Sequence, residues 1–223
     1  MVFPIVLFLV LILVQSTLLM VGNQFVHYAA FAATRSAIVY IPVDDSYDGG
    51  EPANTIIPDE RSRKFEVIRH AAYYAVMPVC GKLDESREDM PADQFVDGLN
   101  EHFAGYGRDA PRWVETLAAA RLRYAAENTE VQILYSDILN DDLDLVDVAA
   151  QGRGYNFGPR ETITVRVEHK LNLSVPYVRA IFADGEHADG QGKYALVAAH
   201  YTLTNEGIDP SLPDPPPIER VTR

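Results

Sequence analysis

Cysteine is almost missing from this 223-residue chain, which contains only Cys80. A single cysteine cannot form an internal disulfide, so a folded domain here must be held together by its own apolar core. The residues around Cys80 read AVMPVCG, which is an apolar setting. That setting favours a buried, unreactive thiol over a catalytic nucleophile.

Basic side chains are scarce as well. The chain has 19 Lys and Arg against 32 Asp and Glu, which gives a formal net charge of −13, and every acidic residue lies beyond position 43. Binding to nucleic acid requires Lys or Arg side chains that displace counterions from the phosphates. The composition therefore argues against a nucleic-acid partner.

Charge is missing altogether from the first twenty residues. Residues 2–22 read VFPIVLFLVLILVQSTLLMVG, which matches the ~20 apolar residues that cross a hydrocarbon core of ~30 Å. A cleaved secretory signal has a basic n-region, a shorter apolar stretch and a small-residue cleavage site. This segment shows none of the three, so we expect a retained, single-pass transmembrane helix in a lipid bilayer.

Helix breakers are absent from residues 23–40, which contain neither Gly nor Pro and are rich in Ala. We expect one helix from Pro4 to Ile41, about 55 Å long at ~1.5 Å per residue, ended by Pro42. Its small residues allow another backbone to approach closely. Two interpretations remain open: the small face packs on other membrane helices, or on the protein's own domain. The candidate helix–helix assembly residues are Gln15, Ala29, Ala33, Ser36 and Ala37.

Gln15 is a polar side chain near the middle of the predicted span. Intramembrane polar residues usually face a partner and can form interhelical hydrogen bonds. The alternative is that Gln15, Ser16 and Thr17 bond to nearby backbone carbonyls. The strongly acidic stretch after Arg35 does not resemble a cytoplasmic juxtamembrane loop. We therefore expect a bacterial inner-membrane protein with a cytoplasmic N-terminus and a periplasmic or extracellular C-terminal domain.

The remainder of the chain predicts an α+β domain. Helices are expected over 61–79, 92–103 and 111–128, the last with an apolar stripe through Trp113, Leu117, Ala120 and Tyr124. Strands are expected over 129–135, 162–175 and 193–203. In the second strand apolar and polar residues alternate, which indicates one buried and one wet face and places His169 in the core. Helices followed by strands favour a small antiparallel sheet.

The predicted organisation has three parts. Residues 1–42 form the transmembrane and extended helix, residues 43–208 form the exported α+β domain, and residues 209–223 form a tail. The tail contains Pro210, Pro213, Pro215, Pro216 and Pro217, so it should be extended.

Motifs for chemistry are missing. The chain has no Gly-x-Ser-x-Gly elbow and no pair of histidines on one helical face, and its glycine-rich stretches lack the spacing of a phosphate loop. The carboxylates Asp141, Asp142, Asp144 and Asp147 lack the glycine and terminal glutamate of a calcium loop, which favours a solvated acidic face. We expect no enzymatic activity, cofactor, metal or small-molecule substrate.

The N-terminal forty residues resemble the TadE family of pseudopilin-like proteins from tight-adherence (Tad) pilus systems. The resemblance rests on Pro4, the apolar run from Ile5 to Val14, Gln15, Gln24 and the stretch AAFAATRSA at residues 29–37. The strand that runs into Thr204-Asn-Glu-Gly207 is also similar. Family members usually carry Glu at the position of Gln15 and have a basic leader with a peptidase cleavage site before the proline.

The resemblance implies a minor pilin or assembly factor without a reaction of its own, whose helix packs among other pilin-like subunits. Two alternatives remain. The chain could be an accessory structural subunit of another bacterial membrane protein complex, with its anchor packed on a larger partner. It could also be a membrane-anchored hydrolase or binding protein, which a deep pocket with clustered carboxylates or histidines would favour.

Overall fold

Residues Val2–Tyr40 form one unbroken helix of 39 residues, α1, as the run of apolar and alanine residues predicts. Ile41 still donates its N–H to Ala37 O at 2.9 Å, and the helix ends before Pro42. The computed structural model describes residues 2–59, 62–83, 91–137, 144–149, 154–187 and 192–205. Within them, α1 is the one helix long and apolar enough to cross a membrane, judged by length and composition.

The other large element is an antiparallel sheet with the strand order β3-β2-β5-β7-β6. Its strands are β2 (Thr129–Asp137), β3 (Asp144–Asp147), β5 (Thr162–Asn172), β6 (Gly185–Glu186) and β7 (Lys193–Thr204). The two longest strands, β5 and β7, pair from Thr162↔Thr204 to Asn172↔Tyr194. A separate two-stranded ribbon joins β1 (Thr55–Ile56) to β4 (Tyr155–Asn156).

The alternation predicted for β5 is confirmed. Ile163, Val165 and Val167 are fully buried, and His169 lies on the same buried face. The predicted α+β class with an antiparallel sheet is likewise confirmed, and the sheet is larger than the three expected strands. The edge strand β3 was not predicted, because two apolar residues between two aspartates give little strand signal. Charged side chains are common on edge strands, where they prevent pairing with other chains.

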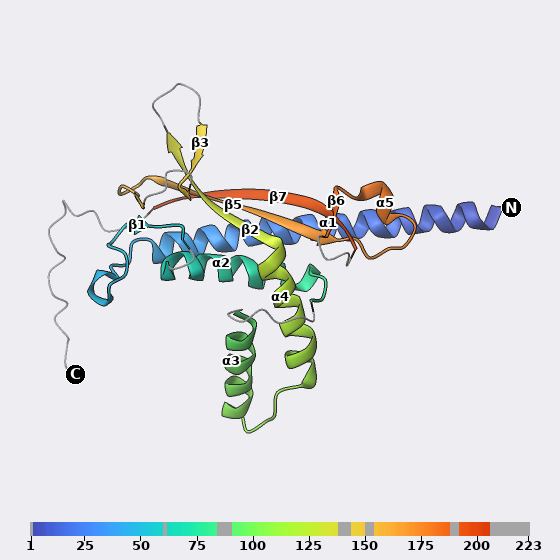
Figure 1. The fold of residues 1–223 in the computed structure, drawn as a ribbon, viewed down its shortest axis with the longest axis horizontal. Coiled ribbons are helices and arrows are strands. Elements are labelled where there is room, and N and C mark those ends of the chain that lie inside the picture. The colour runs from blue at the N-terminus through green and yellow to red at the C-terminus, as the bar shows by residue number, and fades with distance from the viewer. Residues whose placement is uncertain are drawn as a thin grey trace, which may run out of the picture.

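Three longer helices follow α1, near the predicted positions: α2 (Arg63–Val76), α3 (Pro91–Gly105) and α4 (Ala119–Asn128). Ser62 caps α2, because its hydroxyl accepts the Phe65 N–H at 3.1 Å. A short helix, α5 (Arg179–Phe182), lies between β5 and β6. In Figure 1, α3 and α4 project together away from the sheet.

The apolar stripe predicted for residues 111–128 is partly wrong. Trp113 is 52% exposed, whereas Val114, Ala118, Leu122 and Ala125 are buried. The reason is a π-helical turn at Val114–Ala118 just before α4. A wider turn shifts the phase of the residues that precede it, so Trp113 leaves the buried face.

The core lies where α1 passes between β5 and β7 on one side and α2 on the other (Figure 1). Its members include Val26 and Ala33 of α1, Ile41 directly after α1, Ile68 of α2 and Val165 of β5. The C-terminal part of α1 is thus an interior element of the folded domain. The predicted tail, residues 209–223, and the carboxylates Asp141 and Asp142 lie outside the described residues.

Candidate assembly surface on the N-terminal helix

The first turns of α1 are uncovered on every side. All eight residues from Phe3 to Val10 are exposed, with Phe3 at 77% and Ile5 at 64% of full exposure. In Figure 1 this end of α1 projects beyond the rest of the protein. A helix that is apolar around its whole circumference is stable only in lipid or inside a protein assembly.

From Gln15 onward one face of α1 is buried by the protein itself. The buried positions lie on one face of the helix, at intervals of three, four or seven residues with adjacent pairs at 29–30 and 33–34: Gln15, Gly22, Val26, Ala29, Ala30, Ala33, Thr34 and Ala37. The projecting part and the packed part therefore form one continuous helix, and the boundary between them lies close to Gln15.

Small residues on this face let the strands come close. A Cβ built on Gly22 would lie 2.4 Å from Leu171 Cδ2 of β5, so no larger residue fits without displacement. Further along, the Thr34 hydroxyl donates to Ala30 O at 2.7 Å and reaches Tyr201 O of β7 at 3.1 Å. The Phe31 and Tyr201 rings meet edge to face with centroids 5.0 Å apart.

The candidate assembly residues are thereby placed. Ala29, Ala33 and Ala37 are fully buried against the protein's own domain, and Ser36 is half-buried. The structure favours packing of these small residues on the protein's own domain over packing on other membrane helices, because α2 and the sheet already occupy the space that another helix would need. Assembly through these alanines would require the domain to leave α1.

Gln15 finds its partner in the same chain. Its Oε1 atom accepts the backbone N–H of Val175 at 3.2 Å, and the side chain is 1% exposed. Ser16 and Thr17 instead donate to the carbonyls of Ile12 and Leu13, at 2.9 Å and 2.8 Å. The backbone-bonding alternative thus describes Ser16 and Thr17, while Gln15 joins α1 to the segment after β5.

The opposite end of α1 is held by a buried lysine that sequence reasoning missed. Lys64 of α2 is 2% exposed, and its Nζ donates to Ile41 O, Pro52 O and Thr55 O at 3.0, 2.8 and 3.1 Å. Burial lowers the pKa of Lys64, while the nearby carboxylates of Glu51, Asp45 and Asp44 act to raise it. A signal was present, because Lys64 stands four residues before Ile68 on the apolar stripe of α2.

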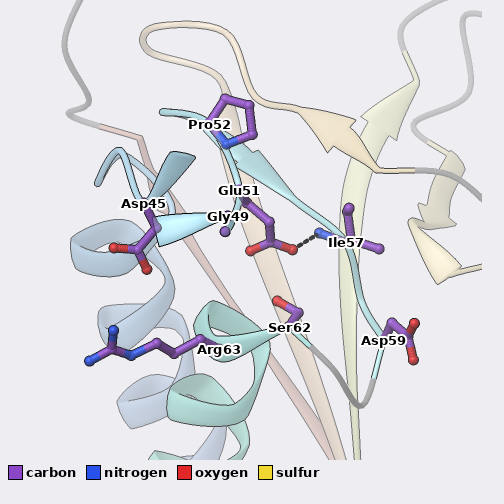
Figure 2. A pocket seen from close by; sticks show the side chains of 9 residues that line it. Asp45, Gly49, Glu51, Pro52, Ile57, Asp59, Ser62 and Arg63 are labelled. Atoms are coloured by element: carbon purple, nitrogen blue, oxygen red, sulfur yellow. Dashed lines mark hydrogen bonds between the residues drawn. The ribbon is translucent and has the colours of Figure 1, made fainter. Parts of the chain in front are cut away.

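An open depression of about 410 Å³ adjoins this end, lined by Asp45, Gly49, Gly50, Glu51, Pro52, Ile57, Asp59, Ser62 and Arg63 (Figure 2). Glu51 Oε1 accepts the Ile57 N–H at 2.7 Å. In Figure 2, Asp45 and Asp59 lie on opposite sides of Glu51 and do not point toward a common centre. Among the described residues, no group of three or more His, Cys, Asp and Glu could hold a metal ion.

The interior histidine and the single cysteine meet in the core. His169 Nδ1 lies 2.8 Å from Thr129 Oγ1, and its Nε2 lies 3.8 Å from Cys80 Sγ. Burial lowers the pKa of His169 to about 4 and raises that of the Cys80 thiol. Both groups are therefore neutral near pH 7, which confirms the predicted core histidine and agrees with an unreactive thiol.

Comparisons of this chain with protein-family models, with curated proteins and with solved structures find no match.

Proposed function

We propose that this chain is a non-catalytic, single-pass membrane protein of the bacterial inner membrane, which assembles through its N-terminal helix. The observation that carries the proposal is the projecting part of α1, where eight consecutive apolar residues are exposed all around the helix. Leaving that surface in water is unfavourable by about 25 cal/mol per Å². Lipid and neighbouring helices are the two environments that remove the penalty. The acidic domain then lies on the periplasmic or extracellular side.

Within this class we propose a pseudopilin-like subunit or assembly factor of a Tad-type pilus or secretion system. The support is the TadE-like pattern of Pro4, the apolar run and the alanine-rich stretch, together with a helix that projects beyond the domain at its N-terminal end and packs on the domain from Gln15 onward. Because the alanines are covered, contacts between subunits would use the projecting segment and the outward residues Tyr28 and Val39, both 57% exposed.

Copurification from native membranes tests the assignment to a system. A tagged full-length chain should bring down components of a Tad pilus machine, such as its prepilin peptidase or secretion ATPase. Recovery of a fixed, cofactor-bearing complex without pilus components would instead support an accessory subunit of another membrane complex. A prepilin peptidase and secretion ATPase encoded beside this chain would add independent support.

Site-directed crosslinking tests assembly through α1. In a Cys80→Ala background, the Phe8→Cys variant should form crosslinked dimers or higher species in membranes, because Phe8 lies in the projecting part. The matched control is Tyr47→Cys, whose side chain is 99% exposed beyond the other end of α1. Equal crosslinking at the two positions would mean random collision, and none at position 8 would argue against assembly through this segment.

A further inference from the structure

On α1, the end of the apolar exposed face and the start of the face that the domain covers do not coincide. Apart from Thr17, whose hydroxyl donates to Leu13 O, the exposed face of α1 stays apolar through Leu18, Met20 and Val21, and further polar exposed residues follow at Asn23 and Gln24. The domain, however, already covers the other face at Gln15. From Gln15 to Val21 the apolar exposed face and the face covered by the domain therefore lie at the same level, over about 9 Å of the helix axis at ~1.5 Å per residue.

The domain residues at this level form a segment of unusual composition. Residues 171–183 read LNLSVPYVRAIFA, with one basic residue, Arg179, and no acidic residue, in a chain that has 32. The next acidic side chains are both engaged: Asp184 Oδ2 accepts the Leu196 N–H at 2.8 Å, and Glu186 lies 3.2 Å from Lys193 Nζ. Residues 171–183 therefore lack acidic side chains, although Asp184 and Glu186 follow directly after them.

The same segment turns large side chains outward. Tyr177 is 84% exposed and Ile181 is 59% exposed, while Val175 and Val178 between and beside them are buried. Tyr177 has φ of 66°, a left-handed conformation that is uncommon for a residue with a side chain. The turn is fixed by the Val178 N–H, which donates to Pro176 O at 2.8 Å. The position of the segment along α1 is set by the hydrogen bond from Val175 to Gln15.

We propose that Tyr177, Arg179 and Ile181 form a membrane-facing surface that rests in the headgroup region of a bilayer around the point where α1 emerges. The proposal builds on the membrane anchoring proposed above. Tyrosine is enriched at membrane–water interfaces, and arginine can extend its guanidinium to the phosphates while its stem lies over apolar surface. An isoleucine beside them gains by leaving water. The occupant of this surface is the lipid that surrounds the anchor.

The consequence is a fixed orientation. An anchor alone would leave α1 and the domain packed on it free to tilt together in the bilayer, whereas a second contact at residues 177–181 holds the long axis of α1 and the sheet at a set angle to the membrane. The segment that follows the C-terminal end of α1, with its exposed Tyr47, then lies on the side away from the bilayer. Orientation of this kind presents the same side faces of every copy to its neighbours.

Depth-dependent quenching tests the proposal on the full-length chain in zwitterionic phosphatidylcholine vesicles. Four single-cysteine variants in the Cys80→Ala background carry an environment-sensitive fluorophore: Phe8→Cys, Tyr47→Cys, Tyr177→Cys and Ile181→Cys. Nitroxide lipids labelled at the headgroup should remove most of the fluorescence at 177 and 181 and leave position 47 unchanged. Nitroxides on the acyl chains should quench position 8.

The outcomes separate the two proposals. Absence of quenching at position 8 by acyl-chain nitroxides would overturn membrane anchoring itself. Quenching at position 8, with 177 and 181 as unaffected as position 47, would overturn only the membrane-facing surface and leave that segment to a protein partner absent from the vesicles. Equal headgroup quenching at 47 and 177 would also overturn it, because the domain would then lie flat on the membrane.

Discussion

The side chain of Gln15 accepts a hydrogen bond from the backbone N–H of Val175 at 3.2 Å, across 160 residues of sequence. This bond lies at the level where the projecting part of α1 meets the domain. It satisfies two buried polar groups at once, because Gln15 is 1% exposed and Val175 is also buried. Gln15, which the sequence marked as a possible contact for a helix of another protein, thus connects α1 to the domain of its own chain.

Replacing Gln15 with Leu should loosen this joint. The Val175 N–H would remain buried without an acceptor, which costs about 1–3 kcal/mol. Hydrogen exchange of the full-length chain in detergent, followed by mass spectrometry, should show faster exchange in peptides that span residues 171–178. Gln15→Glu keeps an acceptor oxygen, as the TadE-like pattern has at this position, and should retain more of the protection.

The matched control is Gln24→Leu, because Gln24 lies on the same helix and is exposed. It should leave exchange in residues 171–178 unchanged. Equal exchange in wild type and Gln15→Leu would show that the Val175 amide does not depend on Gln15.

The elements with strong periodicity were predictable from sequence. The uninterrupted apolar and alanine-rich run predicted α1, and the alternation of apolar and polar residues predicted β5 with His169 inside. Contacts between distant segments were not predictable, because nothing near Gln15 marks Val175 as its partner. For the same reason the small face of α1 fitted a foreign helix and the protein's own sheet equally well.

The sequence did contain one indication that Gln15 has a partner inside the fold, in its spacing from the small and apolar residues of the same helix. Gln15 stands seven residues before Gly22 and eleven before Val26, on one helical face that continues to Ala29 and Ala33. A polar residue in register with a buried stripe points to a partner inside the fold. Lys64 follows the same logic on α2. The exposure of Trp113 carries no such signal, since the π-helical turn that shifts it has no sequence mark that we recognise.

Enlarging Gly22 should separate α1 from the sheet. The Cβ of Gly22→Val would meet Leu171 Cδ2, and Leu171 is itself 4% exposed with little room to move. Overpacking of this kind costs about 1–3 kcal/mol. Thermal unfolding of the full-length chain in detergent, followed by circular dichroism, should shift to lower temperature.

Gly98→Ala is the control for the removal of a glycine from a helix. Gly98 lies inside α3, and a Cβ there meets nothing within 4 Å. Alanine should stabilise α3 by up to about 1 kcal/mol. Destabilisation by Gly98→Ala as well would attribute the Gly22 effect to something other than the contact with Leu171.

Removing the Lys64 ammonium should release the end of α1 from the loop that follows it. Lys64→Met leaves the carbonyls of Ile41, Pro52 and Thr55 without their donor, and the relief of burying a charge offsets only a part of this loss. We expect a net loss of roughly 2–4 kcal/mol in the free energy of unfolding. The neighbouring Arg63→Met, at an exposed position, should change it by less than about 0.5 kcal/mol. Denaturant titration of the two variants measures both values, and equal losses would contradict the role given to Lys64.

Acid should destabilise the domain through His169. An unfolded chain protonates this histidine near its ordinary pKa of about 6.5, whereas burial holds the pKa in the folded protein at about 4. As the pH falls from 6.5 to 4, the unfolded state binds a proton that the folded state does not, so stability decreases. The contribution is complete above pH 6.5 and is lost as the pH approaches 4. At about 1.4 kcal/mol per pKa unit, the loss is roughly 3 kcal/mol.

The measurement compares the free energy of unfolding at pH 7 and pH 4.5 for wild type, His169→Gln and His200→Gln. Glutamine at 169 keeps a polar side chain near Thr129 and does not titrate, so the pH dependence should become shallower by an amount that approaches the value above. His200 is exposed on β7, and its replacement should leave the slope of wild type. Carboxylates that titrate in the same range affect all three proteins alike, so the difference between variants isolates His169. Parallel pH profiles for wild type and His169→Gln would mean that the buried imidazole is not the group that senses acid.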